Sequence, residues 1–136
     1  MIGVRTFKED YALGKQGEKK ALPYIKDYFN SNIEEILDDY SKHDYADNNF
    51  KYELKTRTCK YTAFPTTLMP VDKAVDDKTI FLFQFTDGLY WIRYNADEFK
   101  NFETKQFVRH QRADYNDKEK DYFFIPIDKL TKIIIP

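Results

Sequence analysis

The N-terminal segment has the spacing of an amphipathic helix. Positions 18, 22, 25 and 29 follow the pattern i, i+4, i+7 and i+11, so their side chains share one face of a helix. Leu22, Ile25 and Phe29 are apolar, whereas the first position of this stripe is Glu18. The pattern predicts a helix that packs on a sheet and carries Glu18 on its packed side, with a bend near Pro23.

Strict alternation at residues 50–58 predicts a strand. Glu53 and Lys55 project from one face of it, while Tyr52 and Leu54 project from the other. Along the backbone Glu53 and Lys55 are roughly 6–7 Å apart, so a water molecule or a metal ion fits between their side-chain ends. The same alternation is also typical of the solvated face of an antiparallel strand, so the pattern alone leaves both interpretations open.

The rest of the pattern predicts a mixed sheet backed by helices. A nearly continuous apolar run at residues 80–85 indicates a strand buried on both faces, and Thr86-Asp87-Gly88 predicts a hairpin turn after it. Further strands are expected at 33–37, 44–46, 89–94 and 122–127, and short helices or turns at 70–76, 96–102 and 128–132. The expected fold class is α/β, with a single domain over residues 1–136.

The composition indicates a folded protein inside the cell. Twelve Phe, eleven Tyr and one Trp are spread along 136 residues and suffice for a packed core. Cys59 is the single cysteine, so no disulfide can form within the chain. No stretch reaches the roughly 20 apolar residues of a membrane span. We therefore expect a soluble, intracellular protein, cytoplasmic or nuclear, with no membrane partner.

The net charge of −1, from 22 basic and 23 acidic residues, does not favour nucleic-acid binding. The charges are nevertheless unevenly distributed along the chain. Residues 51–60 and 100–112 each carry four Lys or Arg against one Glu, whereas acidic residues gather at 34–47 and 114–121. A protein that is neutral overall can therefore still present one basic face.

Three carboxylates and one lysine can meet in the predicted sheet. Asp44 lies just before the strand at 50–58, and pairing of the two segments as a hairpin would bring Asp44 near Glu53. Glu18 reaches the same place if its helix packs on that face of the sheet. Mg²⁺ prefers one or two carboxylates completed by water and phosphate oxygens, and a lysine beside it can orient an attacking water. The acids that compete with Asp44 for the upstream position are Asp38, Asp39 and Asp47.

Glu18 on a first helix, Asp44, and Tyr52-Glu53-Leu54-Lys55-Thr56 resemble the PD-(D/E)xK nuclease superfamily, also called the restriction-endonuclease-like fold. The resemblance covers about residues 6–94 and implies an αβββαβ core, a central mixed sheet flanked by helices. It implies that Asp44 and Glu53 bind the metal ion. Lys55 would then be the catalytic lysine, and Glu18 would support the metal or the water. The proline of the family motif is absent, because His43 precedes Asp44.

The resemblance implies a Mg²⁺- or Mn²⁺-dependent nuclease. We expect a deoxyribonuclease acting on DNA, with RNA as the alternative substrate and a homodimer as the alternative to a monomer. Arg57, Lys73 and Lys15 are the candidate contacts to nucleic acid, and ordinary surface solvation is the competing interpretation for each. A different class of function also stays open, namely a non-catalytic nucleic-acid-binding or protein-interaction module on the same fold.

Overall fold

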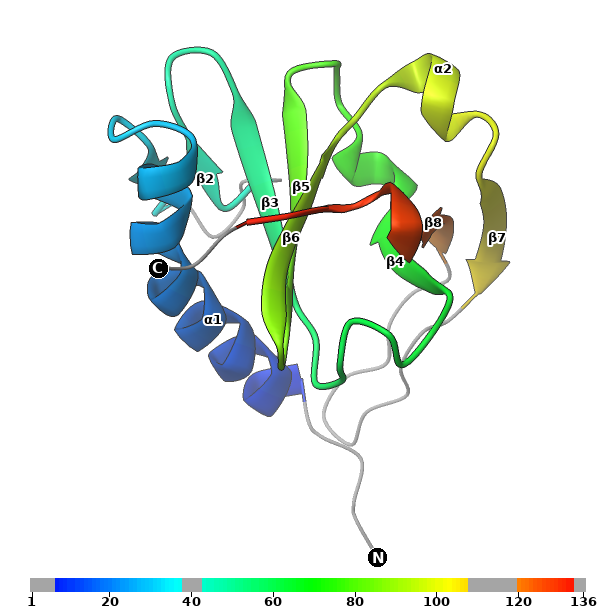
Figure 1. Cartoon of the computed structure of the whole chain (residues 1–136), viewed down its shortest axis with the longest axis horizontal. Coiled ribbons are helices and arrows are strands. Elements are labelled where there is room, and N and C mark those ends of the chain that lie inside the picture. Colours follow the sequence, from blue (N-terminus) through cyan, green and yellow to red (C-terminus); the bar gives the residue numbers. More distant parts are fainter. Residues whose placement is uncertain (1–6, 38–42, 108–119, 134–136) are drawn as a thin grey trace, which may run out of the picture.

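Two parallel strands, β3 (Lys51–Thr56) and β5 (Thr79–Phe85), form the centre of the main sheet in the computed structural model (Figure 1). The structure describes residues 7–37, 43–107 and 120–133. Antiparallel strands extend the sheet on both sides: β2 (Tyr45–Ala46) and β1 (Glu34–Glu35) beyond β3, and β6 (Gly88–Arg93) and β9 (Thr131–Lys132) beyond β5. The strand order β1-β2-β3-β5-β6-β9 confirms the predicted α/β fold with a central mixed sheet.

The long helix α1 (Phe7–Tyr28) covers one face of this sheet. It includes Pro23 and continues beyond it to its end. Ala21 and Ile25 are fully buried and pack in one cluster with Tyr52 and Leu54 of β3. These contacts confirm the predicted apolar stripe, and they turn the side of the helix that carries Glu18 towards the protein.

A second sheet covers the opposite face, where the resemblance implied helices. Its three strands, in the order β4-β8-β7, are β4 (Thr66–Pro70), β8 (Lys120–Pro126) and β7 (Glu103–Phe107). The apolar pattern predicted β8 but neither β4 nor β7, and the expectation of helices on both faces is wrong. The short helix or turn expected at 70–76 is a single 3-10 turn, η1 (Val71–Lys73).

The central strand β5 is buried on both of its faces, as its apolar run predicted. Ile80 and Leu82 belong to the cluster beneath α1, while Phe81 and Phe83 belong to a separate cluster between the two sheets. The remaining elements are the short helix α2 (Ala96–Phe99) and the 3-10 turn η2 (Ile127–Lys129). No helix in the described part of the chain is long and apolar enough to cross a membrane.

Candidate active site

Glu53 and Lys55 form an ion pair on the face of β3 that is turned away from α1. Lys55 Nζ lies 3.3 Å from Glu53 Oε1. Only 3% of Glu53 is exposed, although Lys51 on the same face of the strand is exposed. The alternative interpretation, in which this face of the strand is exposed to solvent, is therefore wrong for Glu53. This carboxylate is held out of water, where an anion needs compensating cations or donors.

A second lysine contacts the same carboxylate oxygen. Lys73 Nζ, from η1, lies 3.7 Å from Glu53 Oε1. His43, which is buried, fixes this turn because its Nε2 donates to the backbone oxygen of Lys73 at 3.3 Å. Burial lowers the pKa of His43, and Nε2 must hold a proton because a carbonyl can only accept. The sequence predicts Lys73 as a contact to nucleic acid, but the alternation of charges in the strand does not predict its contact with Glu53.

Asp44 lies near Glu53, immediately before β2. The ladder of β2 and β3 ends with the pair Tyr45 and Tyr52, and just before it Asp44 N donates to Tyr52 O at 2.9 Å. The Asp44 carboxylate turns back onto β3, where its Oδ2 accepts a hydrogen bond from Leu54 N at 2.7 Å. The predicted hairpin is confirmed, and it brings Asp44 close enough to Glu53 for its charge to raise the pKa of Glu53.

Glu18 approaches Asp44 from α1 and is buried. Its buried Oε2 has Lys15 Nζ 3.4 Å away as an ion-pair partner and has no hydrogen bond that meets ordinary geometry among the described residues. Tyr45 OH donates to the backbone oxygen of Glu18 at 2.5 Å and holds this turn of the helix against β2. Because α1 packs on the face of β3 opposite Glu53, Glu18 reaches the site beside Asp44. The expectation that its helix would cover the Glu53 face is wrong.

The pKa values of the buried groups are displaced towards neutrality. Burial first, and then the hydrogen bond and charge of Asp44, raise the pKa of Glu18 to about 8. Burial raises the pKa of Glu53 to about 7, an effect that Asp44 reinforces and that Lys55 and Lys73 oppose. Burial also lowers the pKa of Lys55, against the attraction of Glu53. Displaced pKa values of this kind are typical of places where charged groups do chemistry or bind ions.

Arg57, which directly follows β3, joins the two sheets. Its Nε donates to Thr67 Oγ1 at 3.2 Å and its Nη2 donates to the backbone oxygen of Leu68, both on β4. The guanidinium also lies over the Phe83 ring, 5.6 Å from its centre. These contacts give Arg57 a structural role, and its predicted contact with a phosphate stays a prediction.

Among the acids that competed with Asp44, Asp47 has a structural role in the turn between β2 and β3. It accepts hydrogen bonds from Asn49 N, Phe50 N and Tyr52 OH. Burial alone would raise the pKa of Asp47, but these three donors lower it. Asp38 and Asp39 lie outside the described residues. Asp44 is therefore the upstream acid in the part of the chain that the structure describes.

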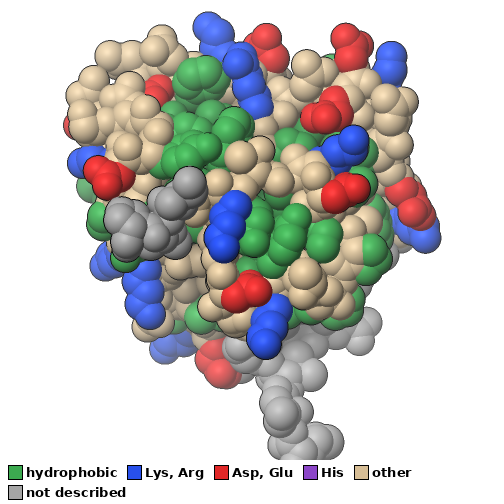
Figure 2. Space-filling view, in the orientation of Figure 1, with side chains coloured by type: hydrophobic (Ala, Val, Ile, Leu, Met, Phe, Trp, Pro, Cys, Tyr) green, Lys and Arg blue, Asp and Glu red, His purple; other side chains and the backbone are tan. Residues whose placement is uncertain are grey.

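The lysines of the site come from three different elements. Lys55 belongs to the basic segment 51–60, whereas Lys73 comes from η1 and Lys15 from α1. Residues 108–112 of the second basic segment and 114–119 of the acidic one lie outside the described residues. Over the face shown in Figure 2, basic and acidic side chains are interspersed, in keeping with the net charge of −1. Positive charge at the site is thus a local result of the fold.

The carboxylates of the site fit a hard divalent cation in part. Within residues 7–37, 43–107 and 120–133, no three Asp, Glu, His or Cys side chains are grouped so that they could hold a metal ion by themselves. Asp44 nevertheless lies near enough to Glu53 to act on its charge, and Glu18 beside Asp44 has the buried oxygen described above. Two carboxylates completed by water and phosphate oxygens are the ligand set that Mg²⁺ prefers.

Comparisons of the chain with protein-family models, with curated proteins and with solved structures gave no significant match. What the site can do therefore has to be inferred from the residues and their geometry.

Proposed function

We propose that this chain is a metal-dependent nuclease of the PD-(D/E)xK type that hydrolyses phosphodiester bonds of DNA. The observation that supports it is the surroundings of Glu53, which is 3% exposed, lies near Asp44 and has two lysines within 3.7 Å. The pKa of Glu53 is still raised to about 7, so the two lysines compensate its burial only in part. A bound divalent cation would complete this compensation.

Asp44 and Glu53 would hold Mg²⁺ or Mn²⁺. In each carboxylate one oxygen is contacted, by Leu54 in Asp44 and by the two lysines in Glu53, and the second oxygen can bind the cation. Leu54 N is bonded to Oδ2 of Asp44, and both lysines approach Oε1 of Glu53, so Oδ1 and Oε2 are the candidate ligands. Such a cation supplies a Lewis acid for phosphoryl oxygens and lowers the pKa of water bound to it. Glu18 supports this pair from α1 through its contact with Asp44.

Lys55 and Lys73 act on the substrate in this proposal. Their ammonium groups lie beside Glu53, so a phosphate that reaches the carboxylates comes within their range. Lys55 Nζ donates a hydrogen bond to the attacking water and to a non-bridging oxygen, which stabilises the charge that builds up there. Because burial lowers the pKa of Lys55, its Nζ exchanges a proton nearer to neutral pH than an exposed lysine does. Lys73 is the second cation on the phosphate.

The test compares two E-x-K pairs of this chain. Glu103 and Lys105 on β7 have the same spacing as Glu53 and Lys55 and form an ion pair of 2.8 Å, but their side chains are 56% and 64% exposed. We expect Glu53→Gln and Lys55→Met each to lower cleavage of plasmid DNA in Mg²⁺ by at least about 100-fold. Glu103→Gln and Lys105→Met should cut like the unaltered protein.

Each protein is incubated with plasmid DNA and with an RNA of the same sequence, in Mg²⁺, Mn²⁺ or EDTA, and its folding is checked by circular dichroism. Cleavage that continues in EDTA, or that survives both Glu53→Gln and Lys55→Met, would overturn the proposal. DNA binding without any product would indicate the non-catalytic binding module instead. Sedimentation of the protein with and without a DNA duplex tests whether two copies assemble on the substrate.

A further inference from the structure

Four lysines form a row along α1. Lys8, Lys15, Lys19 and Lys26 fall within about 40° of one another around the helix axis, because a helix turns roughly 100° per residue. Lys8 and Lys19 are exposed, while Lys15 and Lys26 are half-buried. The row extends over about 27 Å, the rise of about eight nucleotides of one strand in B-DNA. Basic side chains are visible along the left edge of Figure 2, over α1.

The charges of α1 are segregated around its axis. Glu9 and Asp27, two exposed acids of the helix, lie about 100° away from the lysine row. Lys20, which is also exposed, lies near them, about 120° from the row. Glu18, the acid of α1 nearest to the row, is buried and pairs with Lys15, so the exposed lysines of the row face solvent without an exposed acid of the same helix beside them. Such a face suits an extended polyanion better than a surface of mixed charge does.

The lysine row runs past the candidate active site. Glu18 lies between Lys15 and Lys19 in the helix, and Lys15 Nζ is 3.4 Å from the Glu18 carboxylate. Lysines therefore lie on both sides of this carboxylate along the helix axis. A chain of phosphates that followed the row would pass Glu18, the carboxylate that α1 contributes to the site, and continue on both sides of it.

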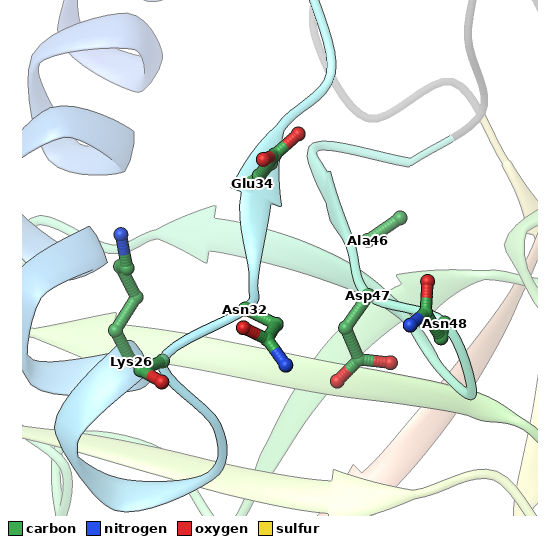
Figure 3. Close-up of a pocket in the computed structure, with 7 residues that line it drawn as sticks. Lys26, Asn32, Glu34, Ala46, Asp47 and Asn48 are labelled. Atoms are coloured by element: carbon green, nitrogen blue, oxygen red, sulfur yellow. The ribbon is translucent and has the colours of Figure 1, made fainter.

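At its far end the lysine row meets a polar pocket beside β1 and β2. Lys26 lines this pocket together with Asn32 and Asn48, whose amide groups can donate to phosphate oxygens (Figure 3). The carboxylate of Asp47, also in the lining, already accepts three hydrogen bonds from its own turn. Glu34 and Asp47 both oppose an anion, but Asp47 is held by its own turn, so the substitution that we expect to strengthen binding is Glu34→Gln.

We propose that the lysine row binds the phosphate backbone of a nucleic-acid strand that continues past the carboxylates on both sides, so that the chain cuts its substrate internally. This inference rests on the proposed function, since it assigns the path of the substrate through that site. Phosphates on the row would lie next to the carboxylates at Lys15 and next to the pocket at Lys26.

The path is tested by the salt dependence of binding to a fluorescent single-stranded DNA 20-mer in EDTA, where no metal-dependent cutting occurs. Each phosphate contact contributes about 0.7 to the slope of log K against log salt for a single strand. Lys19→Gln/Lys26→Gln should therefore lower the slope by about 1.4. The control Lys20→Gln/Lys100→Gln removes two charges as well, one from the other flank of α1 and one from the end of α2, and should leave the slope unchanged.

We call Lys19→Gln/Lys26→Gln the row variant and Lys20→Gln/Lys100→Gln the control variant. Equal salt slopes for these two variants would overturn the proposed path. Failure of the unaltered protein to bind the 20-mer at low salt would overturn it as well. Cutting is tested on a closed single-stranded DNA circle in Mg²⁺. Full-length linear strands should appear first, whereas digestion of linear DNA alone would overturn internal cutting.

The outcomes separate the two proposals. If Glu53→Gln abolishes cutting but the row variant binds like its control, the nuclease stands and the path fails. If the row variant alone loses its salt slope while no protein cuts any substrate, the path stands as a binding surface and the nuclease fails.

Discussion

Lys73 Nζ lies 3.7 Å from the same oxygen of Glu53 that Lys55 Nζ contacts at 3.3 Å. Lys55 lies on β3, where the alternation of the strand places it on the same face as Glu53. Lys73 lies in the 3-10 turn η1, which His43 holds through a hydrogen bond to the backbone oxygen of Lys73. Both positive charges favour the ionised form of Glu53, and each lowers its pKa against the effect of burial. The protonation state of Glu53 therefore depends on a residue that the strand pattern does not include.

We predict that Lys73→Met raises the pKa of Glu53 above its value of about 7, because one of the charges that lower this pKa is removed. The titration of the Glu53 side-chain carboxyl carbon by ¹³C NMR, in protein without metal, measures this directly. Lys78→Met is the control, since Lys78 is exposed and lies five residues further along the chain. An unchanged Glu53 titration in Lys73→Met would show that Lys73 does not act on this carboxylate.

Glu18 should make the protein less stable as the pH rises. Its pKa is raised to about 8 in the folded protein against 4.5 for an ordinary glutamate, so the folded state holds a proton that the unfolded state releases. Its contribution is fully present below about pH 4.5 and is lost as the pH rises towards 8. We predict that Glu18→Gln, which stays neutral, raises the Tm at pH 8 by on the order of 5 °C and changes it little at pH 5.

Thermal unfolding without divalent ions, at several pH values between 5 and 8, measures this effect. Glu98→Gln is the matched control, because Glu98 is exposed on α2. Its Tm difference from the unaltered protein should be the same at both ends of the range. A Glu18→Gln protein whose Tm falls with pH as steeply as that of the unaltered protein would contradict the assignment.

Divalent cations should restore the stability that the protein loses as the pH rises. Because carboxylates must be deprotonated to bind a cation, Mg²⁺ or Mn²⁺ should raise the Tm more at pH 8 than at pH 6. Asp44→Asn should abolish the increase, since it removes the carboxylate near Glu53. EDTA should return the unaltered protein to its metal-free Tm. Glu103→Gln should keep the full increase, and an equal increase in Asp44→Asn would place the cation elsewhere.

The sequence contains two E-x-K pairs on strands, and the pattern of charges alone does not rank them. Glu53-Leu54-Lys55 lies in the sheet centre, and its carboxylate is 3% exposed because both sheets and α1 pack around β3. Glu103-Thr104-Lys105 lies on β7, at the edge of the small sheet, and both charges stay in water. Local alternation predicts which side chains share a face, whereas only the complete fold determines which face is buried.

The features that were missed depend on contacts between distant segments. β4 and β7 are short, and their residues are paired through β8, which lies far beyond β4 in the chain. The contact of Lys73 with Glu53 depends on where the turn η1 lies against β3, which the pattern at 70–76 does not determine. By contrast, the Glu18 stripe, the hairpin of β2 and β3, and the two buried faces of β5 follow from local patterns of the sequence, and these predictions are confirmed.

The position of Glu18 depends on the close contact of α1 with β3. A Cβ added at Gly17 would overlap Thr56 Oγ1 and lie 3.2 Å from Thr56 Cβ, so Gly17→Ala has to push the helix away from the strand. We expect it to lower the free energy of unfolding by about 1–3 kcal/mol, despite the better helix propensity of alanine. At Gly14 an added Cβ meets nothing within 4 Å, so Gly14→Ala should raise stability by up to about 1 kcal/mol.

Urea unfolding of the two alanine variants gives these free energies, and a third variant shows whether the contact itself is responsible. Thr56→Ala removes the oxygen that the methyl group introduced by Gly17→Ala would meet, so the double variant should recover much of the loss caused by Gly17→Ala. If Gly17→Ala moves α1, it also draws Glu18 away from Asp44, and the raised pKa of Glu18 should fall towards that of an ordinary glutamate. A Gly17→Ala protein that is as stable as Gly14→Ala would contradict this packing of α1 on the sheet.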